Sequence, residues 1–189
     1  MSNDVFDRLV GHTFQVEGGF ANIDSDPGGK TRYGITERVA RNNGYQGAME
    51  DLPQDLAYSI YRDAFFLGPK LDEVAERSFK VAREVFDAGV NIAPERAVAM
   101  LQRALNLLNS RARYYSDITS DGMVGPETLG ALDAYFEQRP DMGESVLVKA
   151  LLVQRGSYYM DLAASDEQFE NFLFGWLRRR VDMKAITDG

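Results

Sequence analysis

The fold of this chain is decided by the stretch Glu17-Gly18-Gly19-Phe20-Ala21-Asn22-Ile23-Asp24-Ser25-Asp26-Pro27-Gly28-Gly29-Lys30-Thr31-Arg32-Tyr33-Gly34-Ile35-Thr36. Apolar residues recur with a helical period before it, so the sequence predicts a helix from about Asn3 to the glycine pair Gly18-Gly19. Residues 20–35 are dense in Gly, Asp and Asn. They are predicted to be irregular or to form a short β-hairpin.

Two carboxyl groups in this stretch have different predicted surroundings. Glu17 lies one turn beyond Phe14, so its side chain is expected near the apolar face of the helix, where partial burial keeps a carboxyl protonated. Asp26 belongs to a solvated loop and is expected to be ionised. A protonated carboxyl paired with an ionised one is the arrangement that acid-assisted cleavage of a glycosidic bond requires. The residues therefore predict a glycoside hydrolase with Glu17 as the general acid.

A family resemblance is carried by three segments of this region: Glu17-Gly18-Gly19-Phe20, Asp26-Pro27-Gly28-Gly29-Lys30-Thr31 and Tyr33-Gly34-Ile35-Thr36. They resemble glycoside hydrolase family 108, the N-acetylmuramidases found as phage endolysins and as secretion-linked murein hydrolases. The similarity continues through Phe86-Asp87-Ala88-Gly89-Val90-Asn91, Asp121-Gly122-Met123-Val124-Gly125-Pro126-Glu127-Thr128 and Gly175-Trp176-Leu177. The family more often has Tyr at the position of Phe20 and an Asn-Arg pair near Leu177. The resemblance implies a mainly α, lysozyme-like fold with a small β-hairpin or irregular patch at the active loop.

The resemblance also implies roles for loop residues. Glu17 matches the family's catalytic acid. By similarity to phage lysozymes of the T-even type, Asp26 and Thr31 would hold and activate the attacking water, with Asp24 as a rival for the same task. Such a mechanism inverts the anomeric centre if the two carboxyl groups stand roughly 6.5–9.5 Å apart.

Substrate-binding residues are expected near this loop and on one later helix. Tyr33 lies close to the loop and is a candidate for lining a sugar cleft. Asp87 and Asn91 are four residues apart on one predicted helix face and match the family pattern. Phe169, Phe172 and Trp176 recur with helical spacing, which favours core packing over a carbohydrate platform.

The resemblance predicts two regions in the chain. Residues 1–91 correspond to the lysozyme-like catalytic region of family 108. Residues 92–189 correspond to a helical, predicted peptidoglycan-binding region, which is expected to pack on the first as one body because no Pro/Ser-rich linker separates them.

Further helices are predicted from their starts and stops. One follows Thr36 and ends near Gly44, and another begins at Pro53 and ends before Gly68-Pro69. The rest are expected around residues 81–90, after Pro94, after Pro126, over residues 144–163, and after a capping box at Ser165-Asp166-Glu167-Gln168.

Composition excludes several other classes of protein. The formal net charge of −8 disfavours a sequence-independent nucleic-acid binder. The chain has no cysteine and a single histidine, His12, so thiol chemistry and zinc hydrolase sites lack their ligands. Asn22, Asp24 and Asp26 alternate as in a calcium-binding loop, but Pro27 stands where that loop needs glycine. We therefore expect no metal and no cofactor.

The expected partner is bacterial peptidoglycan, acted on by a monomer without stable membrane insertion. No basic, apolar secretory signal is seen at the N-terminus. The resemblance then predicts synthesis in the host cytoplasm, release by a holin-type partner, and action on the cell wall in the periplasm. Two alternatives stay open: a lytic transglycosylase that uses Glu17 alone, and a non-catalytic wall-binding module.

Overall fold

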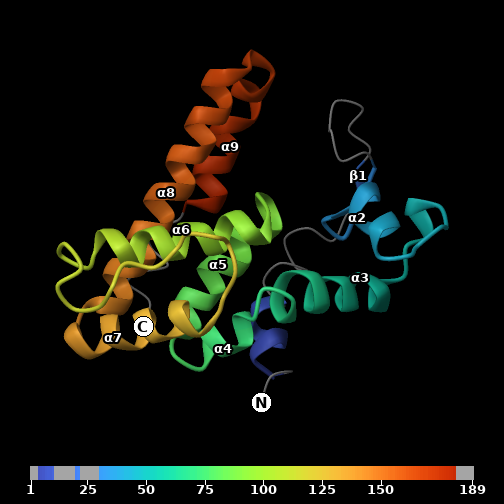
Figure 1. Ribbon diagram of the computed structural model, residues 1–189. Helices are drawn as coiled ribbons and strands as arrows, with labels where there is room; N and C mark the ends of the chain where they lie inside the picture. The colour runs from blue at the N-terminus through green and yellow to red at the C-terminus, as the bar shows by residue number, and fades with distance from the viewer. Residues whose placement is uncertain (1–3, 11–19, 22–29, 182–189) are drawn as a thin grey trace. The chain divides into compact units, whose positions relative to one another are not determined.

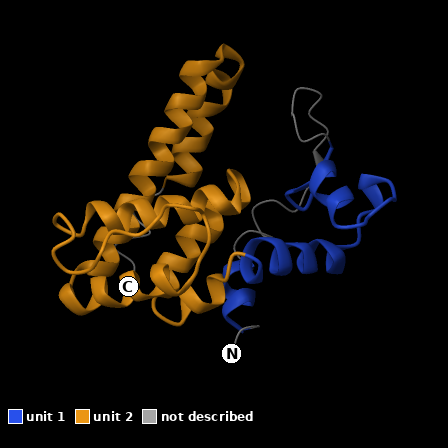
Figure 2. Cartoon of the chain, viewed as in Figure 1, with its two compact units in different colours: residues 1–68 blue, residues 69–189 orange. Residues whose placement is uncertain are grey.

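The computed structural model describes residues 4–10, 20–21 and 30–181. The chain divides into two compact units, residues 1–68 and residues 69–189 (Figure 2). The described residues are mainly helical (Figure 1). Their β structure is one small antiparallel sheet of three strands in the order β1-β2-β3. The predicted mainly α, lysozyme-like fold with a small β patch at the loop is confirmed.

The unit of residues 1–68 contains the sheet and short helices. Residues 4–10 are helical. The following elements are β1 (Phe20–Ala21), β2 (Thr31–Arg32), β3 (Ile35–Thr36), α2 (Glu37–Asn42), the 3-10 helix η1 (Met49–Asp51), α3 (Gln54–Ile60) and the π-helix η2 (Tyr61–Leu67).

Aromatic packing joins the first helix to the last helices of this unit. The Phe6 side chain is fully buried, with its ring centroid 5.0 Å from that of Tyr58 and 5.4 Å from that of Phe66. The Tyr58 hydroxyl also donates a hydrogen bond to the Asp7 carboxylate. Residues 4–10 are therefore fixed to α3 and η2.

Helix boundaries in this unit follow the predicted signals. Thr36 is the N-cap of α2, and its hydroxyl accepts a hydrogen bond from the Val39 amide at 3.4 Å. Pro53 immediately precedes α3. The π-helix η2 was not predicted. It closes where the Gly68 amide donates to the Asp63 carbonyl at 2.8 Å, a bond that spans five residues.

The unit of residues 69–189 is a bundle of longer helices. They are α4 (Leu71–Ala75), α5 (Phe79–Asn91), α6 (Pro94–Leu107), α7 (Pro126–Gln138), α8 (Gly143–Ser165), the 3-10 helix η3 (Glu167–Phe169) and α9 (Glu170–Arg180). Helix α5 packs against α4, α6 and α8, and α9 lies along α8 (Figure 1). Its core is predominantly aliphatic, with Val85, Leu101, Leu132 and Leu152 among the buried residues.

Proline and capping residues set the ends of these helices. Pro94 and Pro126 each occupy the first turn of a helix, as predicted, because proline lacks only an amide that the first turn leaves unpaired. The predicted capping box at residues 165–168 is wrong in detail. Ser165 ends α8, and Asp166 caps η3 by accepting from the Gln168 amide at 3.0 Å.

A buried glutamine secures the turn that precedes α7. The Gln102 side chain is 1% exposed; its amide nitrogen lies 3.0 Å from the Thr128 hydroxyl and 2.8 Å from an Asp121 carboxylate oxygen. Its carbonyl oxygen accepts from the Gly122 amide at 2.9 Å. Gly122 has a φ of +77°, and a Cβ there would lie 2.5 Å from the Glu95 carbonyl oxygen, so the turn requires glycine.

A buried arginine lies between α8 and α5. The Arg155 side chain is 2% exposed, with Nη1 2.5 Å from Asp87 Oδ2 and Nη2 3.3 Å from Glu84 Oε1. Burial raises the pKa of Glu84 to about 8, despite the opposing effect of Arg155. Burial lowers the pKa of the Arg155 guanidinium, but Glu84 and Asp87 outweigh that effect and raise it. Of its two carboxyl partners, Asp87 lies closer to the Arg155 guanidinium.

Replacing Gln102 with leucine should destabilise the unit of residues 69–189. The substitution leaves the Gly122 amide and the Thr128 hydroxyl without their buried partner, so the free energy of unfolding should fall by about 2–4 kcal/mol. Denaturant unfolding followed by circular dichroism measures the change. The same substitution at the exposed Gln138 should change stability by no more than about 0.5 kcal/mol. Equal effects at the two positions would contradict this account.

Replacing Glu84 with glutamine should reduce the pH dependence of stability. The folded protein holds the Glu84 proton up to about pH 8, whereas the unfolded chain releases it near the ordinary value of 4.5. Rising pH therefore favours unfolding between these values, by up to about 1.4 kcal/mol per pH unit.

Unfolding of the parent chain and of the Glu84→Gln variant between pH 5 and pH 8 measures this contribution. The variant should gain stability relative to the parent as the pH rises. Glu127→Gln, at an exposed position, should leave the pH profile of the parent unchanged. A Glu84→Gln profile parallel to that of the parent would refute the assignment.

Candidate active site

The structure describes some of the predicted site residues but not all of them. Glu17 and Asp26, the predicted acid and water-activating carboxylate, lie outside the described residues, as does Asp24. Thr31 and Tyr33 belong to the unit of residues 1–68. Asp87 and Asn91 belong to the unit of residues 69–189. The catalytic and substrate-binding roles of all these residues stay predictions.

Thr31 lies on the central strand of the small sheet. Its backbone pairs with Ala21 of β1 and with Thr36 of β3, so its position is fixed from both sides. The side chain is half-buried. Within the described part of the chain, the Thr31 hydroxyl has no hydrogen-bond partner.

Tyr33 occupies the tight turn between β2 and β3. Tyr33 and Gly34 have φ values of +51° and +74°, the left-handed pair that a two-residue hairpin turn requires. The hydroxyl of the buried Tyr61 donates to the Tyr33 carbonyl at 3.1 Å. The Arg32 guanidinium lies 5.0 Å from the centre of the Tyr33 ring and donates to its hydroxyl at 3.3 Å. Both the backbone and the ring of Tyr33 are therefore held.

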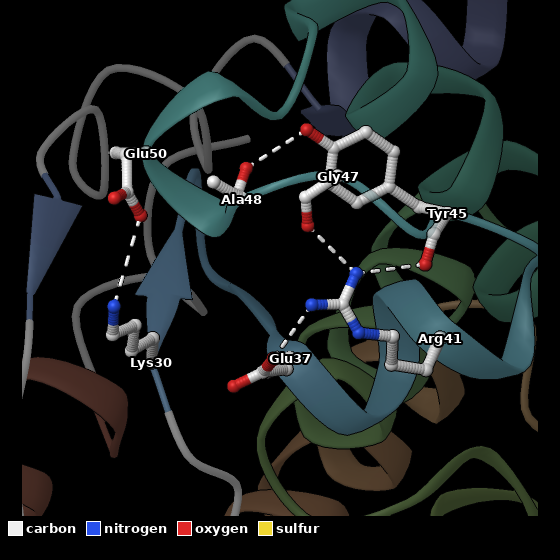
Figure 3. Close-up of polar contacts among 7 residues, drawn as sticks. All are labelled: Lys30, Glu37, Arg41, Tyr45, Gly47, Ala48 and Glu50. Atoms are coloured by element: carbon white, nitrogen blue, oxygen red, sulfur yellow. Dashed lines mark hydrogen bonds and ion pairs between the residues drawn. The ribbon is translucent and has the colours of Figure 1, made fainter.

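An arginine on α2 fixes the segment that follows that helix. The Arg41 guanidinium pairs with the Glu37 carboxylate at 2.7 Å and donates to the Tyr45 and Gly47 carbonyls at 2.9 and 2.8 Å (Figure 3). The Tyr45 hydroxyl donates to the Ala48 carbonyl at 2.8 Å. These contacts tie α2 to the chain that leads into η1.

The residue before β2 is tied to the same framework. The Glu37 amide donates to the Lys30 carbonyl at 2.8 Å, and the Lys30 ammonium lies 3.8 Å from the Glu50 carboxylate (Figure 3). Helix η1 packs beside β2. The hairpin that carries Thr31 and Tyr33 is thus supported from α2 and from η1.

Asp87 and Asn91 lie one turn apart near the end of α5, as predicted. The Asn91 side-chain amide donates to the Asp87 carbonyl at 2.7 Å. The Asp87 side chain is 42% exposed, and one of its oxygens is bound to the buried Arg155. Sequence reasoning missed Arg155, because a single arginine in a long helix gives no sign that its side chain is buried.

Two features are absent from the described residues. Among them, no group of three His, Cys, Asp or Glu side chains could hold a metal ion. No helix in the described part of the chain is both long and apolar enough to cross a membrane.

Comparisons with known proteins identify the two parts of the sequence. Residues 10–92 match the family Glycosyl hydrolase 108, and residues 96–181 match the family Predicted Peptidoglycan domain. No curated protein sequence matches the chain significantly. The structure of Brucella abortus SagA is similar, with 25% sequence identity and a TM-score of 0.75, covering 98% of this chain and 95% of that one.

These matches agree with the segments on which the family resemblance rested. The first match contains Glu17, Asp26, Thr31, Tyr33 and Asp87. The second contains the turn before α7 and the helices α8 and α9. Residues 10–92 thus match glycoside hydrolase family 108, and residues 96–181 match the family Predicted Peptidoglycan domain.

Proposed function

We propose that this chain is an N-acetylmuramidase, a lysozyme that hydrolyses the β-1,4 bond between N-acetylmuramic acid and N-acetylglucosamine in peptidoglycan. The observation that carries the proposal is the pairing of a glycoside hydrolase 108 segment with a peptidoglycan domain in one chain. The similarity to SagA over almost the full length of both chains supports a common architecture.

Glu17 is the proposed general acid. It would donate its proton to the glycosidic oxygen as the bond to the leaving sugar breaks, which removes the need to expel an alkoxide. The Glu17 carboxylate that forms would then regain a proton from the solvent before the next turnover.

Asp26 and Thr31 are the proposed water-binding pair. Asp26 would take a proton from the attacking water, and the Thr31 hydroxyl would orient that water. The backbone of Thr31, paired on both sides within the small sheet, supports this role. Attack from the face opposite the acid gives inversion of the anomeric carbon.

Tyr33, Asp87 and Asn91 are the proposed substrate-binding residues. A tyrosine ring held at a hairpin turn suits stacking against a sugar ring and hydrogen bonding to its hydroxyls. The Asp87 carboxylate and the Asn91 amide suit hydrogen bonding to sugar hydroxyl and acetamido groups.

Peptidoglycan lies outside the cytoplasmic membrane, so the proposal also includes release of the protein to the wall. A holin-type partner for this release stays a prediction.

Replacing Glu17 with glutamine should abolish hydrolysis while leaving binding to insoluble peptidoglycan intact. Loss of a general acid should slow the release of fragments by about 10²–10⁴-fold. Mass spectrometry of the soluble products, with and without borohydride reduction, gives both the rate and the bond cleaved. Glu76→Gln, at an exposed position in the other unit, should retain the parent rate.

The products of the parent chain decide between the proposal and its alternatives. Fragments with a reducible muramic-acid end establish the muramidase, and a reducible glucosamine end would make the chain a glucosaminidase. Products lighter by one water that resist reduction would indicate a lytic transglycosylase. Folded protein that binds peptidoglycan without releasing fragments would be a wall-binding module.

Replacing Thr31 with valine should slow hydrolysis by about 10²-fold, because it removes the hydroxyl that orients water and keeps the shape of the side chain. Thr31→Ser, which keeps a hydroxyl, should lie within about tenfold of the parent. Asp26→Ala should slow the reaction at least as much as Thr31→Val. Thr119→Val, at an exposed position, is the matched control. Full activity of both Asp26→Ala and Thr31→Val would favour the transglycosylase, which needs no activated water.

A further inference from the structure

One ion pair connects the two family segments within a single compact unit. Asp87 lies on α5, inside the glycoside hydrolase match, and Arg155 lies on α8, inside the peptidoglycan domain match. Both belong to the unit of residues 69–189. The Arg155 Nη1 and Asp87 Oδ2 atoms are 2.5 Å apart.

Burying this guanidinium is expensive for the fold. The Arg155 side chain is 2% exposed. Among the described residues, its Nε has no hydrogen-bond partner, and neither does the Tyr159 hydroxyl in the same core. Glu84 Oε1 lies 3.3 Å from Arg155 Nη2 but makes no hydrogen bond of good geometry. A well-packed apolar side chain at such a position is often at least as stable as an ion pair. Stability alone therefore does not explain why an arginine, rather than an apolar residue, occupies position 155.

The two carboxyl groups beside Arg155 differ in exposure, and Asp87 is the more exposed of the two. The Glu84 side chain is 10% exposed, whereas that of Asp87 is 42% exposed. One Asp87 oxygen is committed to the buried guanidinium, and the other has no hydrogen-bond donor among the described residues. The result is a half-exposed carboxylate with one oxygen held by a buried guanidinium.

We propose that Arg155 is a positioning residue that fixes the Asp87 carboxylate for hydrogen bonding to the glycan. A residue of the peptidoglycan domain segment then contributes to sugar binding through the core of the unit. This inference rests on the proposed function, because it assumes that Asp87 binds substrate. A carboxylate already oriented loses less freedom when it binds a sugar hydroxyl, so the contribution appears in affinity.

Kinetics on soluble peptidoglycan strands test the proposal in the full-length chain. Asp87→Asn should raise KM about tenfold, because it weakens a charged hydrogen bond to the substrate, with kcat within about twofold of the parent. Arg155→Lys keeps the charge but loses the guanidinium fork, and it should raise KM by a similar factor. The exposed pair Arg77–Asp133, joined by two hydrogen bonds of 2.7 and 3.0 Å, supplies the matched controls. Arg77→Lys and Asp133→Asn should leave both constants unchanged.

The double variant separates positioning from a merely structural role. If Arg155 acts through Asp87, then Arg155→Lys/Asp87→Asn should raise KM about tenfold, no more than Asp87→Asn alone. Independent effects would multiply to about a hundredfold. A multiplicative result would overturn the proposal, and so would an unchanged KM in folded Arg155→Lys.

A second variant keeps the test decisive if Arg155→Lys does not fold. Glu84→Met/Arg155→Met replaces the buried carboxyl group and the buried guanidinium with apolar groups of similar length, an exchange that helical cores often tolerate. It removes the anchor of Asp87 and should raise KM about tenfold, whereas a folded variant with the parent KM would overturn the proposal. Absence of muramic-acid ends with the parent chain would instead refute the proposed function. An active parent whose Asp87→Asn variant keeps its KM would refute the inference alone.

Discussion

The Arg155 guanidinium lies among packed helices, where a charge is stable only if acidic groups lie beside it. Helix α5 supplies two such groups, Glu84 and Asp87, which are three residues apart and so on one face. A shift of α5 by one residue would turn that face by about 100° and leave the guanidinium without these partners. The contacts of Arg155 therefore fix the register of α5 against α8. Because α6 packs on both of these helices, that register also determines the core between them.

This constraint explains why the family segments and the compact units have different limits. The glycoside hydrolase match ends at residue 92, yet the compact unit begins at Pro69 and includes α4 and α5. Helix α5 makes its packing contacts with α4, α6 and α8, all in the same unit. The division predicted at residue 91 describes sequence families and stays a prediction. A glycoside hydrolase segment cut at that point would expose the apolar face of α5 together with Glu84, which is buried in the intact unit.

Local sequence signals predicted most of the helices. The buried polar side chains could not be predicted, because their burial depends on residues distant in the sequence. Pro94 and Pro126 restrict the backbone wherever they stand, so their helix starts could be predicted without knowledge of the fold. Ser165 and Asp166 are both favourable N-cap residues. Because α8 extends to Ser165, Asp166 is the residue that caps η3. The burial of Gln102 and Arg155 depends on partners 19 to 26 and 68 to 71 residues away in sequence, which no short pattern reveals. The same reason explains why no pattern in the sequence indicated Arg155 as the partner of Asp87, whose role as a site residue stays a prediction.

The hairpin at Tyr33 shows how backbone conformation bears on function. Its turn needs two left-handed residues, for which Asn-Gly is the favoured pair, and Tyr33 adopts that conformation with a φ of +51°. A bulky residue there costs of order 1 kcal/mol or more, a strain that persists only where surrounding contacts enforce it. The Tyr61 hydroxyl and the Arg32 guanidinium supply such contacts to its carbonyl and its ring. Asparagine would form the turn at lower cost, so the strained backbone at Tyr33 depends on the contacts that Tyr61 and Arg32 make with it.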